Sequence, residues 1–352
     1  MKILLLSPLP PPSGGIATWT VLYEQYCRER KIPVSIVNNA LVGARKDKMS
    51  LKRNLLDEVR RTVGIIGRLI RTLHHERPDV IHINTSCSRF GVYRDCICAM
   101  ISRVYAVPVV VQCHCNIQDQ IRDKAAELAF RVMASISQKV LVLNRFSAEY
   151  ARQFANVRVT VIPNFMTEAA VFERKSVAEE IRQVVFVGHV RKEKGVEEIL
   201  KAAAQLRDVR FTLIGPVQQD LDGLVQSDNV DLLGTQPHGT VLELLKQADA
   251  FLFPSYTEGF ANAMLEAMAA GLPIIATDVG ANAEMIENQG GLIVPTGDVD
   301  AIVGAINELK NDPPRRLAMG SWNMKKVKSE YLLDVVMKQL MEIYSSVCQA
   351  KE

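Results

Sequence analysis

The chain has 352 residues, of which 48% are hydrophobic and 23% charged, and its net charge is +3 with histidine neutral. This length is greater than one hydrophobic core usually needs, so it predicts two domains. No apolar run approaches the ~20 residues of a membrane-spanning helix. The apolar start of the chain meets Pro8 and Pro10 too soon for a signal peptide, so we expect a cytoplasmic protein.

In the first half of the chain, short apolar strands alternate with helical stretches. The helical stretches include residues 16–30 and 51–75. The strands are predicted at Ile3–Leu6, Val34–Val37, Val80–Asn84, Val109–Cys113 and Lys139–Val142. This alternation predicts a parallel, doubly wound sheet with helices on its faces.

Positive charge gathers in the first half of the chain. Residues 1–170 hold 24 of the 42 Lys and Arg but only 13 of the 39 Asp and Glu, a net charge of +11 that leaves −8 for the rest. Ten of these cations lie between residues 45 and 77. An apolar stripe in the same segment, Leu55, Val59, Val63, Ile66, Ile70 and Leu73, has helical spacing. The stripe predicts a helix packed on the core, and the basic face suggests an anionic membrane surface.

The second half repeats the same alternation. Its strands are predicted at Val184–Val187, Phe211–Ile214, Val230–Leu232, Ala250–Phe253, Ile274–Ala276 and Gly291–Val294. Two similar α/β domains in tandem are therefore expected, with the boundary near residues 162–165. An amphipathic helix at about residues 331–348 ends the chain.

The segment from Phe253 to Asp298 is the most informative part of the sequence. It contains two glutamates separated by seven residues, Glu258 and Glu266, and the intervening turn leads into a helix that stops at Gly271-Leu272-Pro273. A helix that begins at the carboxyl end of a strand offers free backbone N–H groups to an anion such as a diphosphate. Two solvent-facing glutamates on an ordinary helix are the alternative.

This segment resembles the retaining glycosyltransferases of family 4, which have the two-domain GT-B fold: an α/β architecture with two Rossmann-like domains facing each other across a cleft. The resemblance is specific in the second half and generic in the first. It implies an acceptor-side domain of residues 1–165 plus a returning C-terminal helix at about 331–352, and a nucleotide-sugar-binding domain of residues 166–330.

The resemblance also implies roles for the glutamate segment. Glu258 would accept a hydrogen bond from a hydroxyl of the donor sugar, and Glu266 would bind the ribose. The backbone of Gly259, Phe260 and Ala261 would meet the phosphate. Asn262 is a further candidate contact, although a structural role at the start of the helix is equally expected.

A basic loop, Gly188-His189-Val190-Arg191-Lys192-Glu193-Lys194-Gly195, follows the first strand of the second half. Cations at this edge of a sheet suit a pyrophosphate. The similar loop of the family carries an Arg and a Lys that neutralise the donor diphosphate. Lys194 matches that lysine, whereas His189 stands where the arginine is usual, so Arg191 or Lys192 would have to replace it. A solvated basic loop is the alternative.

In the first half, Gly14 and Gly15 follow the first strand and resemble the glycine loop that faces the donor phosphate in the family. A flexible turn is the alternative. His114 directly follows the strand Val109–Cys113, at the position where the family has a histidine beside the reacting carbon of the donor sugar. A structural histidine is the alternative. Asn84 and Asn144 end two further strands, which face the same cleft.

The seven cysteines are not spaced as a disulfide scaffold. Both Cys96-Ile97-Cys98 and Cys113-His114-Cys115 lack the usual zinc-knuckle spacing, and in a strand each pair would place its thiols on one face. Buried free thiols are therefore expected, and no metal site or cofactor.

We therefore predict a retaining, metal-independent glycosyltransferase that moves a sugar from a nucleoside-diphosphate sugar, with uridine diphosphate as the commonest case. Its acceptor would be a saccharide or a lipid-linked saccharide in surface polysaccharide or glycolipid synthesis, reached from the cytoplasm or from the cytoplasmic face of a membrane. Nothing indicates a nucleic-acid partner. Two alternatives stay open: a nucleotide-sugar epimerase of the same fold, which the glutamate pair disfavours, and a non-catalytic nucleotide-sugar-binding subunit, which His189 favours.

Overall fold

The computed structural model describes the chain except for residues 12–13, 41–54, 155–157, 173–177, 219–226 and 350–352. The chain divides into two compact units. The first unit contains Met1–Phe165 and Leu333–Glu352, and the second contains Met166–Leu332. Among the described residues, no helix is long and apolar enough to cross a membrane.

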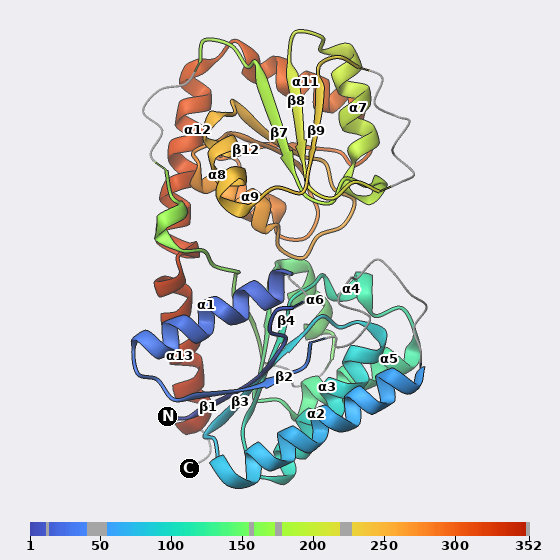
Figure 1. The fold of residues 1–352 in the computed structure, drawn as a ribbon, viewed down its shortest axis with the longest axis vertical. Coiled ribbons are helices and arrows are strands. Elements are labelled where there is room, and N and C mark those ends of the chain that lie inside the picture. Colours follow the sequence, from blue (N-terminus) through green and yellow to red (C-terminus); the bar gives the residue numbers. More distant parts are fainter. Residues whose placement is uncertain (12–13, 41–54, 155–157, 173–177, 219–226, 350–352) are drawn as a thin grey trace. The chain divides into compact units, whose positions relative to one another are not determined.

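The first unit is built on a parallel sheet of six strands in the order β2-β1-β3-β4-β5-β6 (Figure 1). Five of them match the predicted strands to within a residue at either end. The bounds are β1 Ile3–Ser7, β2 Val34–Asn38, β3 Val80–Thr85, β4 Val109–Cys113, β5 Lys139–Val142 and β6 Val159–Val161. The short edge strand β6 was not predicted, because three residues are too few to establish a strand pattern.

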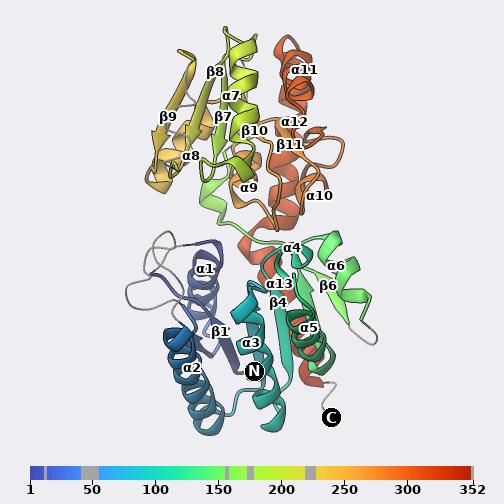
Figure 2. The ribbon, with the colours of Figure 1, turned by 90° about the vertical axis from the view of Figure 1, so that its right-hand side faces the viewer.

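Helices cover both faces of this sheet (Figure 2). Right-handed crossovers place helices on opposite faces wherever the strand order reverses, here between β1 and β3. Consequently α1 lies on one face, while α2, α3 and α5 line the other. The bounds are α1 Gly15–Glu29, α2 Leu55–Glu76, α3 Arg89–Val104, α4 Ile117–Gln120, α5 Lys124–Ile136, α6 Arg145–Arg152 and the C-terminal α13 Leu333–Gln349.

The C-terminal helix α13 packs on the same face as α1. Its apolar residues share one core cluster with β1 and α1, and these buried residues are Val336, Met337, Leu340, Tyr344 and Val347. The Tyr23 hydroxyl donates to the Tyr344 hydroxyl at 3.3 Å, and Tyr344 in turn hydrogen-bonds His82 Nδ1. Burial lowers the pKa of His82 to about 3, so a neutral imidazole accepts this bond within the core.

The second unit has its own parallel sheet of six strands, in the order β12-β11-β10-β7-β8-β9. The strands are β7 Gln183–Val187, β8 Arg210–Ile214, β9 Val230–Gly234, β10 Ala250–Phe253, β11 Ile274–Thr277 and β12 Gly291–Val294. The helices are α7 Val196–Gln205, α8 His238–Gln247, α9 Asn262–Ala269, α10 Asn282–Ile286, α11 Val299–Lys310 and α12 Pro313–Lys326. Here the strand order reverses between β7 and β10, so the carboxyl ends of these two strands lie side by side.

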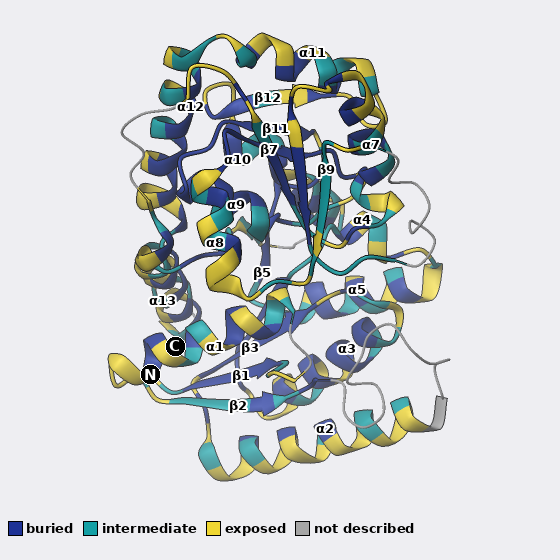
Figure 3. Cartoon of the chain, turned by 45° about the horizontal axis from the view of Figure 1, so that its top comes forward, coloured by how far each residue is buried: buried dark blue, intermediate teal, exposed yellow. Residues whose placement is uncertain are grey.

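The predicted apolar stripe of α2 only partly faces the core. Leu73 is buried and Ile66 partly buried, but Val59, Val63 and Ile70 are 54%, 64% and 39% exposed. Besides Leu73, the core cluster contains Ile65 and Leu69, which the predicted stripe did not include, and Ile66 packs against it. The helix is thus apolar on more than one face. Figure 3 shows its outer face as largely exposed. Residues 45–54 of the basic segment, and the side chain of Leu55, lie outside the described residues.

Cys96 and Cys98 both lie within α3, so the strand geometry considered for their spacing does not apply to them. The adjacent apolar residues of that segment follow a helical rather than an alternating pattern. All seven cysteines are free thiols, as expected, and five of them are buried.

Candidate functional site

The strongest cluster of predicted residues lies where the strand order of the second sheet reverses. Lys194 follows β7 and Glu258 follows the neighbouring β10, and the two side chains form an ion pair. They are only 14% and 13% exposed. Ser255 Oγ also donates to Glu258 Oε1, at 3.3 Å. The two residues are therefore not solvated surface charges, since a buried carboxylate needs a partner of this kind.

The basic loop reaches this position through a tight turn. Residues Lys192–Lys194 form one 3-10 turn, and Gly195 then adopts φ +72°. A Cβ at Gly195 would lie 2.1 Å from the carbonyl oxygen of Pro254, in the loop after β10. Only glycine permits the two loops to approach this closely, and that approach brings Lys194 to Glu258.

The other cations of the basic loop turn elsewhere. Arg191 Nε lies 3.7 Å from Glu193 Oε2, and Lys192 Nζ lies 2.9 Å from Glu197 Oε1 at the start of α7. His189 lies two residues beyond β7. Arg191 and Lys192, the two candidates for the second cation, therefore pair with Glu193 and Glu197. Only Lys194 pairs with the predicted site residue, Glu258.

The turn from Gly259 to Ala261 leads directly into α9, whose first residue is Asn262. The N-terminal end of a helix carries a partial positive charge, which favours the binding of an anion. Phe260 is buried, with its ring 5.7 Å from that of Tyr331. The turn is supported by the loop after β11, because the backbone N–H of Ala281 donates to the Gly259 carbonyl at 3.2 Å.

Glu266 lies on α9, and its side chain is 22% exposed. His238 Nε2 is 2.9 Å from Glu266 Oε1, and this hydrogen bond raises the pKa of His238 above its ordinary value. His238 was not predicted. It is the first residue of α8, just beyond β9, so its position at the carboxyl edge of the sheet was the available signal.

In the first unit, His114 directly follows β4 and joins a chain of hydrogen bonds. Its Nε2 lies 2.9 Å from Asn84 Oδ1, and Asn84 Nδ2 donates to Ser7 Oγ at 2.9 Å. The Trp19 ring packs edge-on, 5.3 Å from that of His114. The structure therefore brings together the candidates His114 and Asn84 at the carboxyl edge of the first sheet.

The chain of hydrogen bonds fixes the tautomer of His114. The Thr20 hydroxyl donates to the Ile16 carbonyl, so at the 2.6 Å contact between the hydroxyls Ser7 must donate to Thr20. Ser7 then accepts from the Asn84 amide, and the Asn84 oxygen faces His114. Hence the proton of His114 lies on Nε2. Burial lowers the pKa of His114, which keeps the ring neutral at physiological pH.

Gly14 and Gly15 lie at the start of α1, with the Gly14 carbonyl accepting from the Thr18 N–H at 2.9 Å. Gly14 has an extended φ of 171°, which any residue can adopt, so its backbone requires no glycine. Asn144 caps α6: its Oδ1 accepts from the Ser147 N–H at 2.8 Å. The structure therefore gives Asn144 a structural role.

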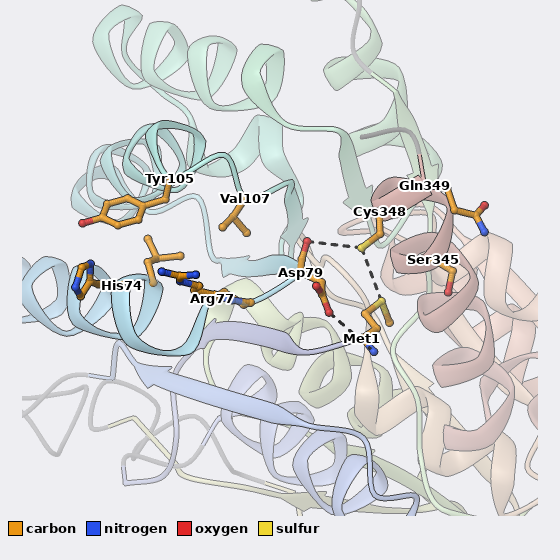
Figure 4. A pocket seen from close by; sticks show the side chains of 11 residues that line it. Met1, His74, Arg77, Asp79, Tyr105, Val107, Ser345, Cys348 and Gln349 are labelled. Carbon is orange, nitrogen blue, oxygen red and sulfur yellow. Dashed lines mark hydrogen bonds and ion pairs between the residues drawn. The ribbon is translucent and has the colours of Figure 1, made fainter. Parts of the chain in front are cut away.

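A pocket of 720 Å³ lies at the amino ends of β1, β3 and β4 in the first sheet (Figure 4). It is lined by Met1, Leu73, His74, Arg77, Pro78, Asp79, Tyr105, Val107, Ser345, Cys348 and Gln349. None of the predicted residues is among these. Ligand sites of open parallel sheets form at the carboxyl ends of the strands, so this pocket is separate from the candidate site. No metal-binding cluster of three or more His, Cys, Asp or Glu occurs among the described residues.

Two family models match consecutive parts of the chain. The model described as glycosyl transferases group 1 matches residues 168–326, and the one described as glycosyltransferase family 4 matches residues 13–168.

Three relatives illustrate the range of proteins that the chain resembles. The capsular polysaccharide biosynthesis glycosyltransferase CapM of Staphylococcus aureus is 26% identical, and the match covers 47% of this chain and 47% of CapM, so the chain matches about half of that relative. Alpha-D-kanosaminyltransferase of Streptomyces kanamyceticus is 27% identical, and the match covers 70% of this chain and 73% of that relative. D-inositol 3-phosphate glycosyltransferase of Pseudarthrobacter chlorophenolicus is 29% identical, and the match covers 83% of this chain and 76% of that relative.

Two solved structures resemble the whole chain. Sucrose-phosphate synthase from Thermosynechococcus elongatus has a TM-score of 0.80 at 17% identity, covering 99% of each chain. Anabaena Alr3699/HepE, solved in complex with UDP and glucose, has a TM-score of 0.75 at 18% identity, covering 98% of this chain and 100% of that one. These likenesses confirm the predicted GT-B fold.

Gly280→Ala should disturb the candidate site through the backbone. Gly280 has φ +57°, and a Cβ there would lie 2.3 Å from the Glu258 carbonyl oxygen. We expect a stability loss of at least about 1–2 kcal/mol from the left-handed conformation alone, measured by urea unfolding. The control is Gly304→Ala in α11, where a Cβ meets nothing within 4 Å; it should be neutral or stabilising by up to about 1 kcal/mol. Equal stability of the two variants would contradict this role of Gly280.

His238→Gln should change stability in a pH-dependent way. Because the folded-state pKa of His238 is raised, the charged pair with Glu266 stabilises the fold fully below the unfolded-state value of about 6.5 and is lost as the pH rises through the folded-state value. The difference in thermal midpoint between wild type and variant should therefore be largest at pH 5.5 and shrink toward pH 8.5. Glu266→Gln should show the same trend, whereas a difference that grows with pH would refute it.

Proposed function

The chain belongs to the group 1 glycosyltransferases of the GT-B fold, and from this premise we propose that it is a retaining, metal-independent enzyme that uses a nucleoside-diphosphate sugar. The observation that carries the proposal is the largely buried Lys194–Glu258 pair beside the start of α9. A cation, the N-terminal end of a helix and a carboxylate are the groups that a diphosphate joined to a hydroxylated sugar requires.

In the proposed mechanism, the donor diphosphate takes over Lys194 from Glu258. The ammonium and the first N–H groups of α9 then stabilise the negative charge that develops on the leaving diphosphate. Glu258, released from Lys194, accepts a hydrogen bond from a donor-sugar hydroxyl, while Glu266 binds the ribose. Because protein groups supply the positive charge, a divalent metal is not required.

The transfer step is proposed to be a front-face displacement. The acceptor hydroxyl oxygen bonds to the anomeric carbon on the face from which the diphosphate leaves, and its proton passes to a phosphate oxygen. From the first unit we propose His114 as a residue that contacts the donor sugar. Its ring is neutral, with its proton on Nε2 and hydrogen-bonded to Asn84. Because Nε2 donates to Asn84, the neutral ring can contact a sugar only through Nδ1, which would accept a hydrogen bond from a sugar hydroxyl without adding charge.

Uridine diphosphate is proposed as the donor nucleotide. HepE, which shares the fold, was solved with UDP and glucose, and this supports the choice. The acceptor is proposed to be a saccharide or a lipid-linked saccharide of a surface polysaccharide or glycolipid. The support here is that one relative, CapM, is named for capsular polysaccharide biosynthesis.

We also propose that α2 docks the enzyme on an anionic membrane. Exposed Val59, Val63 and Ile70 lie on the same helix as exposed Arg60, Arg68 and Arg71. An exposed apolar line next to cations is the composition of a helix that lies in a membrane interface. Each cation near an anionic surface contributes about 1 kcal/mol to binding.

Lys194→Ala should lower kcat/KM for transfer by about 100-fold or more, because it removes a group that stabilises the leaving charge. Lys192→Ala is the matched control: it removes a cation from the same loop, but one whose partner is Glu197, and it should stay within a few-fold of wild type. Glu258→Gln should lower turnover more than it weakens nucleotide binding, since only the intact donor has a sugar to hold.

These assays should be repeated in excess chelator, in which full transfer is expected. Activity that is lost in chelator and restored by Mg²⁺ would overturn metal independence alone. Equal activity of the Lys194 and Lys192 variants would overturn the diphosphate site. A protein that binds nucleotide but neither transfers nor isomerises a sugar would be a non-catalytic subunit, and acceptor-independent isomerisation would identify an epimerase.

Co-sedimentation with liposomes tests the membrane proposal. Wild type should pellet with vesicles containing anionic lipid and stay in solution with neutral vesicles, and Val63→Glu should reduce pelleting several-fold by placing a carboxylate in the apolar line. The control Leu233→Glu changes an exposed apolar residue of the second unit and should pellet like wild type. Equal pelleting of wild type with both kinds of vesicle would count against an anionic docking surface.

A further inference from the structure

Three cysteines of the first unit gather at the carboxyl ends of two neighbouring strands. Cys113 is the last residue of β4, Cys115 lies two residues beyond it, and Cys87 lies two residues beyond β3. Cys87 and Cys113 belong to one buried core cluster, and Cys115 packs against that cluster. The transfer mechanism proposed above uses none of them.

The backbone explains why these thiols meet. In the parallel register Thr85 lies opposite Cys113, and the His114 N–H donates to the Thr85 carbonyl at 2.8 Å. Beyond β3 the chain then turns: the Cys87 N–H donates to Thr85 Oγ1 at 3.0 Å, and Cys87 adopts φ +50°. This turn keeps the side chain of Cys87 inside the core cluster that also contains Cys113.

The thiols differ in acidity and in access. Hydrogen bonds donated by Cys113 and Cys115 lower the pKa of Cys87, although its burial acts in the opposite direction. The same contacts raise the pKa values of Cys113 and Cys115. Cys87 and Cys113 are buried, whereas Cys115 is partly exposed. The cluster therefore combines a sulfur favoured as thiolate, the reactive form, with a neighbouring thiol that solvent reaches.

We propose that Cys87 and Cys115 form a reversible disulfide when the protein meets an oxidant of the peroxide class, and that this bond slows sugar transfer by displacing His114. The formation of the disulfide is independent of the proposed function, whereas its effect on transfer rests on that function.

The reaction balances with hydrogen peroxide as the two-electron oxidant. The thiolate of one cysteine attacks a peroxide oxygen, the O–O bond breaks, and a sulfenic acid and hydroxide form. The sulfur of the second cysteine then attacks the sulfenic sulfur and expels its oxygen. Overall, two thiols and one H₂O₂ give one disulfide and two molecules of water. A dithiol reductant reverses the bond by thiol–disulfide exchange.

The disulfide would act on His114 because Cys115 is the next residue. Bonded sulfurs are about 2.05 Å apart, so residue 115 must move toward Cys87. The backbone around it is already tied elsewhere, since Ser147 Oγ donates to the Cys115 carbonyl at 3.3 Å and accepts from the Ile117 N–H at 3.2 Å. The displacement is therefore expected to change the position of the His114 ring relative to Asn84.

The test is peptide mass spectrometry of the full chain after treatment with hydrogen peroxide, without reductant. We expect a linked pair of peptides containing Cys87 and Cys115, two hydrogens lighter than the separate thiols, that disappears with dithiothreitol. Cys115→Ser should abolish the link. Cys348→Ser is the matched control, since Cys348 is partly exposed but lines the pocket at the other edge of the sheet (Figure 4), and this variant should link like wild type.

Transfer activity is then measured on the same samples. Peroxide should lower the activity of wild type and Cys348→Ser at least several-fold, dithiothreitol should restore it, and Cys115→Ser should stay active. A link from Cys87 to Cys113, or no link at all, would overturn the assigned pair. A link that leaves transfer unchanged would overturn the effect on His114. If peroxide forms the link but the reduced protein also has no transfer activity, the proposed function is contradicted and the disulfide assignment stays intact.

Discussion

In a parallel sheet all strands end at the same edge, and where the strand order reverses two neighbouring loops diverge and leave room for a ligand. The second unit reverses between β7 and β10, and there Lys194 meets Glu258. The first unit reverses between β1 and β3, where Ser7 and Asn84 connect α1 to His114. The positions of both residue clusters therefore follow from strand order.

Much of this could be predicted from local sequence patterns. Short apolar runs between helical stretches gave the parallel sheets, because strands covered on both faces are continuously apolar. The residues at the carboxyl edge, such as Lys194, Glu258 and His114, could be predicted because they directly follow or lie close behind those strands. The close approach of Lys194 to Glu258 could not be predicted from the sequence, since it depends on how closely Gly195 packs against Pro254.

The features that sequence reasoning missed depend on packing between distant segments. The periodicity of α2 could not show which of its apolar lines contacts the sheet, and the structure leaves Val59 and Val63 exposed. His238 reaches Glu266 from a separate helix. Cys87 is 26 residues before Cys113, and only the pairing of β3 with β4 brings them together. In each case a long-range contact, and not a local propensity, decides the role of the residue.

We infer that the carboxyl edge of the second sheet binds a nucleoside diphosphate. The most direct measurement is the thermal unfolding midpoint of the wild-type protein with UDP, GDP or ADP, each tested with its sugar conjugates. A ligand at one hundred times its dissociation constant stabilises the folded state by about 2.7 kcal/mol, which shifts the midpoint measurably. We expect a shift only with the uridine nucleotides. If none of the nucleotides shifted the midpoint, the second sheet would not bind a nucleoside diphosphate at this edge.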